Sequence, residues 1–203
     1  SRGWIDLDEL SHAIRDDTAV VSIMMANNET GTILPVEEAG KIVKDRGVLF
    51  HVDAVQATGK IPLDMSKSNI DLLALSGHKL HAPKGVGALY IRRGIPFRAF
   101  MIGGHQERNR RGGTENVASV VALGKACELA QEHISEENTR VRAMRDRLEQ
   151  GLLSKGPDAR LNGHPLHRLP NTANISFEYV EGEAILLMLN QFKICASSGS
   201  ACT

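Results

Sequence analysis

The sequence has little net charge, few cysteines, few aromatic residues and no long apolar run. Its 203 residues include 24 basic and 24 acidic side chains, so the formal net charge is zero. A balanced charge gives no electrostatic case for nucleic acid or a membrane as the main partner. The basic cluster 108–111 (RNRR) is short and lacks interleaved aromatic residues. We interpret it as a contact for an anionic ligand or a second subunit, or as a solvated loop.

The small number of cysteines and the lack of a long apolar run bear on the cellular compartment of the protein. The three cysteines lack the paired spacing that suggests a disulfide framework or a zinc site, which indicates a reducing compartment. No apolar run approaches the ~18 residues of a membrane helix, and the N-terminus lacks the basic start and apolar core of a signal peptide. We therefore expect a cytoplasmic protein without a metal. The first residues do not resemble a natural start, which leaves a mitochondrial origin open.

Strand and helix patterns alternate in the first half of the chain. Short apolar runs predict buried strands, and apolar residues spaced three and four apart predict helices. The predicted order is helix 6–16, strand 19–26, helix 36–46, strand 48–52, strand 72–76 and strand 87–91. This order is typical of an α/β fold, with helices on both faces of a mainly parallel sheet and an antiparallel strand at its edge.

Helical patterns dominate from Glu115 onward. An apolar stripe at helical spacing occurs at Val141, Met144, Leu148 and Leu152. After Pro157 the sequence predicts a strand, a helix and a strand at 172–177, 181–191 and 192–196. We expect residues 1–124 to be part of a large domain. Residues 125–203 are expected to form a connecting helix and the beginning of a small C-terminal α+β domain.

A lysine stands at the end of a predicted buried strand. Residues 72–75 (LLAL) run into 76–79 (SGHK), so Lys79 lies where the strand meets a loop. A partly desolvated amine in such a place can condense with an aldehyde to form a Schiff base. For a lone lysine, the ordinary interpretation is a packed stem with its ammonium group in water. The residues at the other strand ends favour the chemical interpretation.

Two further strand ends carry polar clusters. Asp53 and Gln56 follow the second predicted strand, and residues 27–31 (NNETG) follow the first. Pyridoxal phosphate enzymes need a carboxylate at the pyridine nitrogen and a lysine for the aldehyde, and Asp53 and Lys79 fit these roles. The carboxyl ends of parallel strands meet at one edge of a sheet, so we expect the three clusters to converge on one pocket. Each cluster alone also fits a turn or a helix cap.

Together these segments resemble the cysteine desulfurases of the NifS/IscS type, which are pyridoxal phosphate enzymes of fold type I in the class-V aminotransferase family. The matching segments occur in the family's order along the chain: 27–31 (NNETG), 52–56 (VDAVQ), 76–79 (SGHK), 83–85 (PKG), 111–116 (RGGTEN) and 197–203 (SSGSACT). The last segment is the most specific, because it resembles the loop that carries the catalytic cysteine in the first of the family's two groups. Its small polar residues are typical of a mobile loop.

The resemblance implies two catalytic residues. Lys79 would hold pyridoxal phosphate and move protons. Cys202 would take the sulfur of L-cysteine as a persulfide and leave L-alanine. A sulfur-acceptor or iron–sulfur scaffold protein would then receive the sulfur.

The resemblance also implies the cofactor contacts. They would be Asp53 at the pyridine nitrogen, Gln56 at the ring oxygen, Ser76 and His78 at the phosphate, and Asn28 near the bound amino acid. Thr114 would reach the phosphate of the neighbouring subunit, which implies a homodimer. Cys127 and Cys195 fit buried structural thiols instead, one on an apolar helix face and one in the predicted strand 192–196.

Compared with the family, the chain begins late and ends early, so we expect an internal fragment that covers about the middle half of the family's length. Two classes of function stay open. One is a cysteine desulfurase, with a selenocysteine lyase as a close alternative and a fold-type-I aminotransferase as a more distant one. The other is a non-catalytic relative that keeps the fold and takes part in protein interactions.

Overall fold

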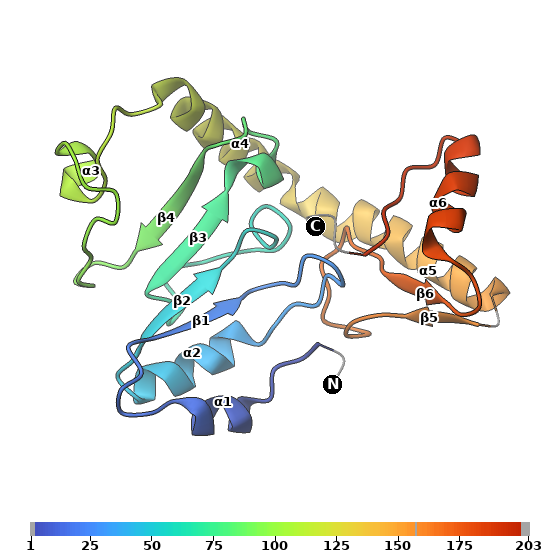
Figure 1. The fold of residues 1–203 in the computed structure, drawn as a ribbon, viewed down its shortest axis with the longest axis horizontal. Helices are drawn as coiled ribbons and strands as arrows, with labels where there is room; N and C mark the ends of the chain where they lie inside the picture. Colours follow the sequence, from blue (N-terminus) through green and yellow to red (C-terminus); the bar gives the residue numbers. More distant parts are fainter. Residues whose placement is uncertain (1–2, 157, 200–203) are drawn as a thin grey trace.

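Four strands form a sheet in the order in which they occur in the chain. The computed structural model describes residues 3–156 and 158–199. β1 (Val20–Met24), β2 (Leu49–Asp53) and β3 (Leu72–Ser76) are parallel neighbours, and β4 (Gly87–Ile91) is antiparallel to β3 (Figure 1). The predicted α/β fold with a mainly parallel sheet and an antiparallel edge strand is therefore confirmed.

The alternation of side chains along the strands decides which face of the sheet is buried. The main core contains alternate residues of the strands together with α1 (Leu7–Ala13) and α2 (Val36–Asp45): Val21, Ile23, Phe50, Val52, Leu73 and, from α2, Val43. On the opposite face, Val20 and Met24 remain exposed in the described part of the chain. That face also carries a hydrogen bond of 2.7 Å between Ser22 and His51. Among the described residues, the main core thus lies on one face of the sheet.

One continuous helical segment leads from the sheet to the second part of the chain. α4 (Val117–Glu136), a π-helical turn (Glu137–Val141) and α5 (Arg142–Lys155) follow one another without interruption. Figure 1 shows this segment passing from the sheet toward β5, β6 and α6. Cys127 packs on an apolar face of α4, as predicted. The helical pattern of the predicted stripe is also confirmed, although Met144 and Leu148 are exposed.

The second part contains a small hairpin-like sheet and a helix. β5 (Ala159–Leu161) pairs antiparallel with β6 (Ile175–Phe177), and α6 (Gly182–Gln191) follows. The predicted strand 172–177 and helix 181–191 correspond to β6 and α6, whereas β5 was not predicted. A further short helix, α3 (Gln106–Asn109), lies between β4 and α4.

The predicted strand 192–196 is wrong, and with it the predicted burial of Cys195. The backbone N–H groups of Phe192 and Ile194 both donate to the carbonyl of Leu189, and Lys193 has a φ of 59°. These are the hydrogen bonds and the left-handed residue of a helix C-terminus. The N–H groups of Phe192 and Ile194 are therefore not available to pair with a neighbouring strand. Residues 192–196 form no strand, and Cys195 is exposed.

The segment 164–170 joins the two parts of the chain. Leu169 is buried in the main core, its N–H donates to the carbonyl of Gly31, and the N–H of Ile33 donates to the carbonyl of His167. Thr32 is fully buried and its hydroxyl accepts the N–H of His164. The segment that carries Asn28 is therefore tied to the second part of the chain. The domain division after residue 124 stays a prediction.

A buried ion pair holds the same segment on α5. Arg168 Nη2 contacts both carboxylate oxygens of Glu149 at 2.5 Å, and the side chains are 1% and 9% exposed. The guanidinium atoms Nε and Nη1 of Arg168 are buried without a partner among the described residues. Since a charge left alone in such a place is costly, this pair depends on both partners.

Arg168→Met should lower the free energy of unfolding by up to about 3–5 kcal/mol, because it leaves the buried carboxylate of Glu149 with only Arg145 Nε, at 3.9 Å, as a cationic partner. Urea unfolding of the full-length protein measures the change. The double change Arg168→Met with Glu149→Leu should recover a large part of the loss. Arg15→Met is the matched control, since Arg15 pairs with Asp17 at the surface. An unfolding midpoint of Arg168→Met equal to that of the control would contradict this account.

Every helix within residues 3–156 and 158–199 is too short or too polar to cross a bilayer.

Candidate active site

The carboxyl ends of β2 and β3 bring two predicted site residues to one edge of the sheet. Asp53 is the last residue of β2 and pairs in register with Ala74 of β3. Ser76 is the last residue of β3, two positions beyond Ala74. Because side chains alternate along a strand, Ser76 projects from the same face as Ala74 and Asp53. The strand-end positions predicted for these residues are thus observed.

The carboxylate of Asp53 is oriented by the turn that follows it. Its Oδ1 accepts the backbone N–H of Val55 at 2.9 Å. The side chain is exposed, and Oδ2 has no hydrogen-bond partner within the described residues. Gln56 lies half-buried in the same turn, whose N–H groups at Ala57 and Thr58 donate to the carbonyl of Ala54. This arrangement leaves one carboxylate oxygen available to a donor above the strand end.

A tight 3-10 turn, Gly77–Leu80, follows β3 and carries His78 and Lys79. Gly77 lies so close to Val86 that a Cβ atom would stand 2.9 Å from the Val86 carbonyl oxygen. Ser76 Oγ and His78 Nδ1 are hydrogen-bonded at 2.7 Å. Whichever of the two donates, the other keeps a free donor: the imidazole Nε2–H or the serine O–H. The pair can therefore always donate one hydrogen bond to an anion.

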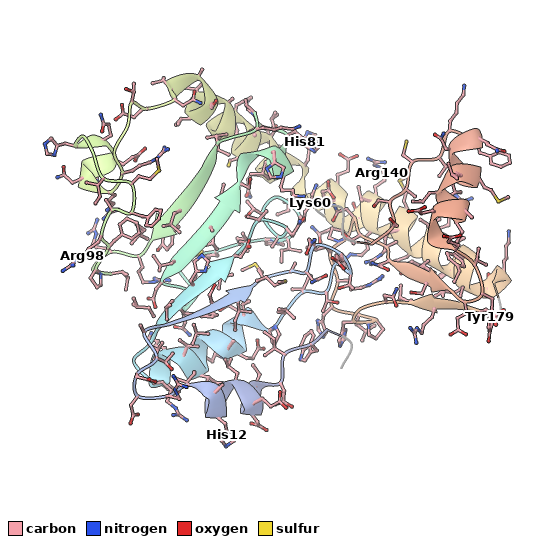
Figure 2. The ribbon with its side chains drawn as sticks, viewed as in Figure 1. His12, Lys60, His81, Arg98, Arg140 and Tyr179 are labelled. Carbon is pink, nitrogen blue, oxygen red and sulfur yellow. The ribbon has the colours of Figure 1, made fainter. Side chains whose placement is uncertain are left out.

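Lys79 is half-buried and also lines a pocket of about 390 Å³ behind the 3-10 turn. The pocket lies between this turn, the turn after β2 and the long helix. Figure 2 labels three of its lining residues: Lys60 in the turn after β2, His81 directly after the 3-10 turn, and Arg140 in the long helix. Of the predicted site residues that the structure describes, Lys79 lines this pocket, whereas Asp53 and Ser76 end β2 and β3.

The charges of this pocket are largely paired with one another. Lys60 and Glu137 are 3.0 Å apart, and Arg140 and Glu136 are 2.6 Å apart. The hydrogen bond from Arg140 lowers the pKa of Glu136 below its ordinary value. The pocket that Lys79 lines thus contains two ion pairs.

The remaining predicted residues lie in two loops. Asn27 Oδ1 accepts the N–H groups of Glu29 and Thr30, so Asn27 forms the turn after β1. Asn28 beside it is exposed. Thr114 is exposed in the loop between α3 and α4, which Figure 1 shows apart from the carboxyl ends of β2 and β3. The structure therefore does not bring Thr114 to that edge of the same chain. Cys202 lies outside the described residues.

The donor set at the strand ends fits pyridoxal phosphate. The cofactor presents a pyridine nitrogen, a phenolic oxygen, an aldehyde and a phosphate, and these call for a carboxylate, a donor, an amine and an anion site. Asp53 keeps a carboxylate oxygen available, and Gln56 offers an amide donor. The Ser76–His78 pair offers the donor for an anion, and Lys79 offers the amine.

Three residues that the structure connects with this site were not predicted from the sequence. Lys60 ends the turn that contains Gln56, and Glu137 and Asn138 of the long helix contact it. An asparagine inside a helical pattern was the one available signal, because asparagine is a poor helix former. Its partner, 78 positions away, could not be found from local sequence.

Comparison with known proteins identifies the family of the chain. The profile of the Aminotransferase class-V family matches residues 1–203. The chain is 64% identical over 203 residues to "Cysteine desulfurase 2" of Trichormus variabilis, covering all of this chain and 51% of that protein. It is 58% identical over 202 residues to "Cysteine desulfurase NifS" of Azotobacter vinelandii, covering all of this chain and 50% of that protein. The chain thus spans about half the length of the curated relatives it matches.

Solved structures give the same result. A "NIFS-LIKE PROTEIN" matches with a TM-score of 0.91 at 43% identity, over 97% of this chain and 54% of that one. A NifS-like protein from Rickettsia africae matches with a TM-score of 0.90 at 35% identity, over 98% of this chain and 56% of that one. The resemblance to the NifS/IscS type is confirmed. The chain belongs to the class-V aminotransferase family, which depends on pyridoxal phosphate.

Proposed function

We propose that the full-length protein containing this chain is a cysteine desulfurase, which converts L-cysteine to L-alanine and transfers the sulfur to Cys202. The observation that carries the proposal is the presence of Asp53, Ser76, His78 and Lys79 at the adjoining carboxyl ends of β2 and β3. The names of relatives at 58% and 64% identity support the choice of reaction within the family.

Each side chain at this edge has a distinct task in binding pyridoxal phosphate. The carboxylate of Asp53, fixed by the N–H of Val55, would pair with the pyridine nitrogen, and Gln56 would donate to the ring oxygen. Ser76 and His78 would hold the phosphate. When bound, the cofactor supplies an electron sink that weakens the bonds at the α-carbon of an amino acid.

Lys79 would hold the cofactor and move protons at its Nζ atom. Lys79 lies in the 3-10 turn Gly77–Leu80, which directly follows β3. An amine held there can accept a proton from the α-carbon and return one to the product. Asn28 would orient the bound amino acid from the turn after β1.

Cys202 would accept the sulfur. Its thiolate attacks the sulfur atom of the substrate, a new S–S bond forms and the substrate C–S bond breaks. The electron pair of the broken bond stays with the carbon skeleton, which takes up a proton and leaves as L-alanine. The sulfur remains on Cys202 as a persulfide.

The expected partners follow from this role. Thr114 would contact the phosphate in a neighbouring subunit, so we propose a homodimer. A sulfur-acceptor or iron–sulfur scaffold protein would take the persulfide sulfur, and the proposed location is the cytoplasm.

The test is the product balance of the purified full-length protein with pyridoxal phosphate, L-cysteine and a thiol reductant. One alanine per sulfide is the expected result. Release of pyruvate and ammonia in place of alanine, or transamination without sulfide, would contradict the proposal. A much larger specific activity with L-selenocysteine would favour the selenocysteine lyase instead.

A further inference from the structure

The long helix contains one π-helical turn, at Glu137–Val141. It lies where the helix passes the turn after β2, since Glu137, Arg140 and Val141 share a pocket with Gly59 and Lys60. α4 before it contacts the 3-10 turn of Lys79, and α5 after it contacts β5. Single π-helical turns often occur at functional sites, where a side chain enters the hydrogen-bond ladder of the helix.

Asn138 is the side chain that enters the ladder. Its Nδ2 donates to the carbonyl of Ile134, at 2.9 Å, and to the carbonyl of Lys60, at 2.8 Å. Arg142 Nη2 donates to Asn138 Oδ1 at 3.0 Å. Because Arg142 holds the amide oxygen, the amide NH₂ group points at the backbone of the turn after β2. A single side chain thus links the helix to that turn.

An ion pair reinforces the same link. Lys60 Nζ and Glu137 Oε1 are 3.0 Å apart, and their side chains are 18% and 21% exposed. Glu137 Oε2 is buried without a partner among the described residues. A pair this sheltered is worth more than a surface pair, and removal of either member leaves the other partly buried and unpaired.

The linked turn begins and ends at fixed points. It starts directly after Asp53, which the sheet holds, contains Gln56, and ends at Lys60, which the helix holds. Between these points Lys60 N–H donates to the carbonyl of Ala57. At Gly59, with a φ of +74°, a Cβ atom would lie 2.6 Å from Leu80 Cδ2 and 3.0 Å from Ala130 Cβ. The turn is therefore packed between the 3-10 turn and the helix.

The N–H of Ile61 also donates to the carbonyl of Ala57, so the turn spans residues 54–61. We propose that Asn138 and Glu137 are positioning residues that fix this turn, and through it Gln56 and the carboxylate of Asp53, against the long helix. This inference rests on the proposed function for what the turn binds. The consequence is that the cofactor contacts depend on the helix that leads to β5, β6 and α6. A shift of this helix would loosen the turn.

The test uses the full-length protein with Asn138→Ala and, separately, Glu137→Gln. Hydrogen–deuterium exchange of the amides in 54–61 is measured without cofactor, and the dissociation constant of pyridoxal phosphate is measured by absorbance. Loss of one or two such hydrogen bonds should make exchange about tenfold faster and cofactor binding about tenfold weaker. Thr139→Ala is the matched control, because Thr139 Oγ1 bonds only to the helix carbonyl of Ser135, and it should match the wild type.

Three outcomes would overturn the inference: unchanged exchange in 54–61 for both variants, equally faster exchange in β1–β3, or the same effect from Thr139→Ala. Lys60→Met should give the same faster exchange in 54–61 as Glu137→Gln. Lys60→Arg, which keeps the positive charge, should exchange as slowly as the wild type. The exchange test does not need enzymatic activity. Failure of the proposed function would appear as missing alanine and sulfide in the wild type, while faster exchange in the variants would still support the positioning role.

Discussion

Lys79→Ala in the full-length protein is expected to abolish covalent binding of pyridoxal phosphate and to lower sulfide release from L-cysteine by more than about a thousandfold. Lys79 is the amine at the carboxyl end of β3, beside the Ser76–His78 pair. Its loss removes both the covalent attachment and the group that moves protons. Absorbance spectra, borohydride trapping and a sulfide assay measure the two effects.

Lys41→Ala provides the control, since Lys41 is an exposed lysine on α2. It should keep the spectrum, the borohydride-stable label and the rate of the wild type. Addition of a small primary amine to Lys79→Ala should restore a part of the rate, because the missing group is an amine. A wild-type spectrum and rate in Lys79→Ala would remove this residue from its proposed role.

Cys202→Ala should reduce sulfide release to background while the cofactor spectrum remains that of the wild type. The thiolate is the acceptor of sulfur in the proposed reaction, and alanine at this position has no nucleophile. The cofactor contacts are assigned to the strand ends and not to the cysteine loop, so binding of pyridoxal phosphate should be unaffected. Sulfide assays and mass spectrometry of the persulfide-bearing peptide test both parts.

Cys195→Ala is the matched control for the thiol. Cys195 lies seven positions earlier in the sequence and is an exposed thiol. Its replacement should leave sulfide release and the persulfide on Cys202 unchanged. Persistent sulfide release in Cys202→Ala, or its loss in Cys195→Ala, would contradict the assignment.

The strands of the first half could be predicted from sequence because their signals are local. Strands 72–76 and 87–91 were predicted with the observed bounds of β3 and β4. Both are apolar runs, which end before Gly77 and Arg92 respectively. The parallel arrangement of the first strands was predicted from the helices and loops between them. The predicted strand ends then placed Asp53 and Ser76 at one edge of the sheet.

The wrong and missed predictions concern residues whose structure depends on partners outside the local sequence. Residues 192–196 contain the apolar side chains of a strand, but the end of α6 uses their backbone donors. Strand β5 is three residues long and depends on its pairing with β6. Likewise, the link from Asn138 to Lys60 joins residues far apart in sequence. No local pattern contains these partners.

The positions of the candidate site residues were predicted in part. Residue type and the order of the strands predicted Asp53, Ser76, His78 and Lys79 near adjoining strand ends, because parallel strands bring their carboxyl ends together, and the structure has them there. The half-burial of Gln56 and the orientation of Asp53 by Val55 required the structure. The roles of all these residues stay predictions, and those of Asn28, Thr114 and Cys202 rest on resemblance alone.

The placement of Lys79 in the active site can be tested by borohydride reduction of the full-length protein with pyridoxal phosphate, followed by peptide mass mapping. We expect one stable label, on the peptide that contains Lys79, and its disappearance when the substrate L-cysteine is added before reduction. A label on Lys60 or Lys84, or no label with the cofactor present in excess, would contradict the placement of the active site at the carboxyl ends of β2 and β3.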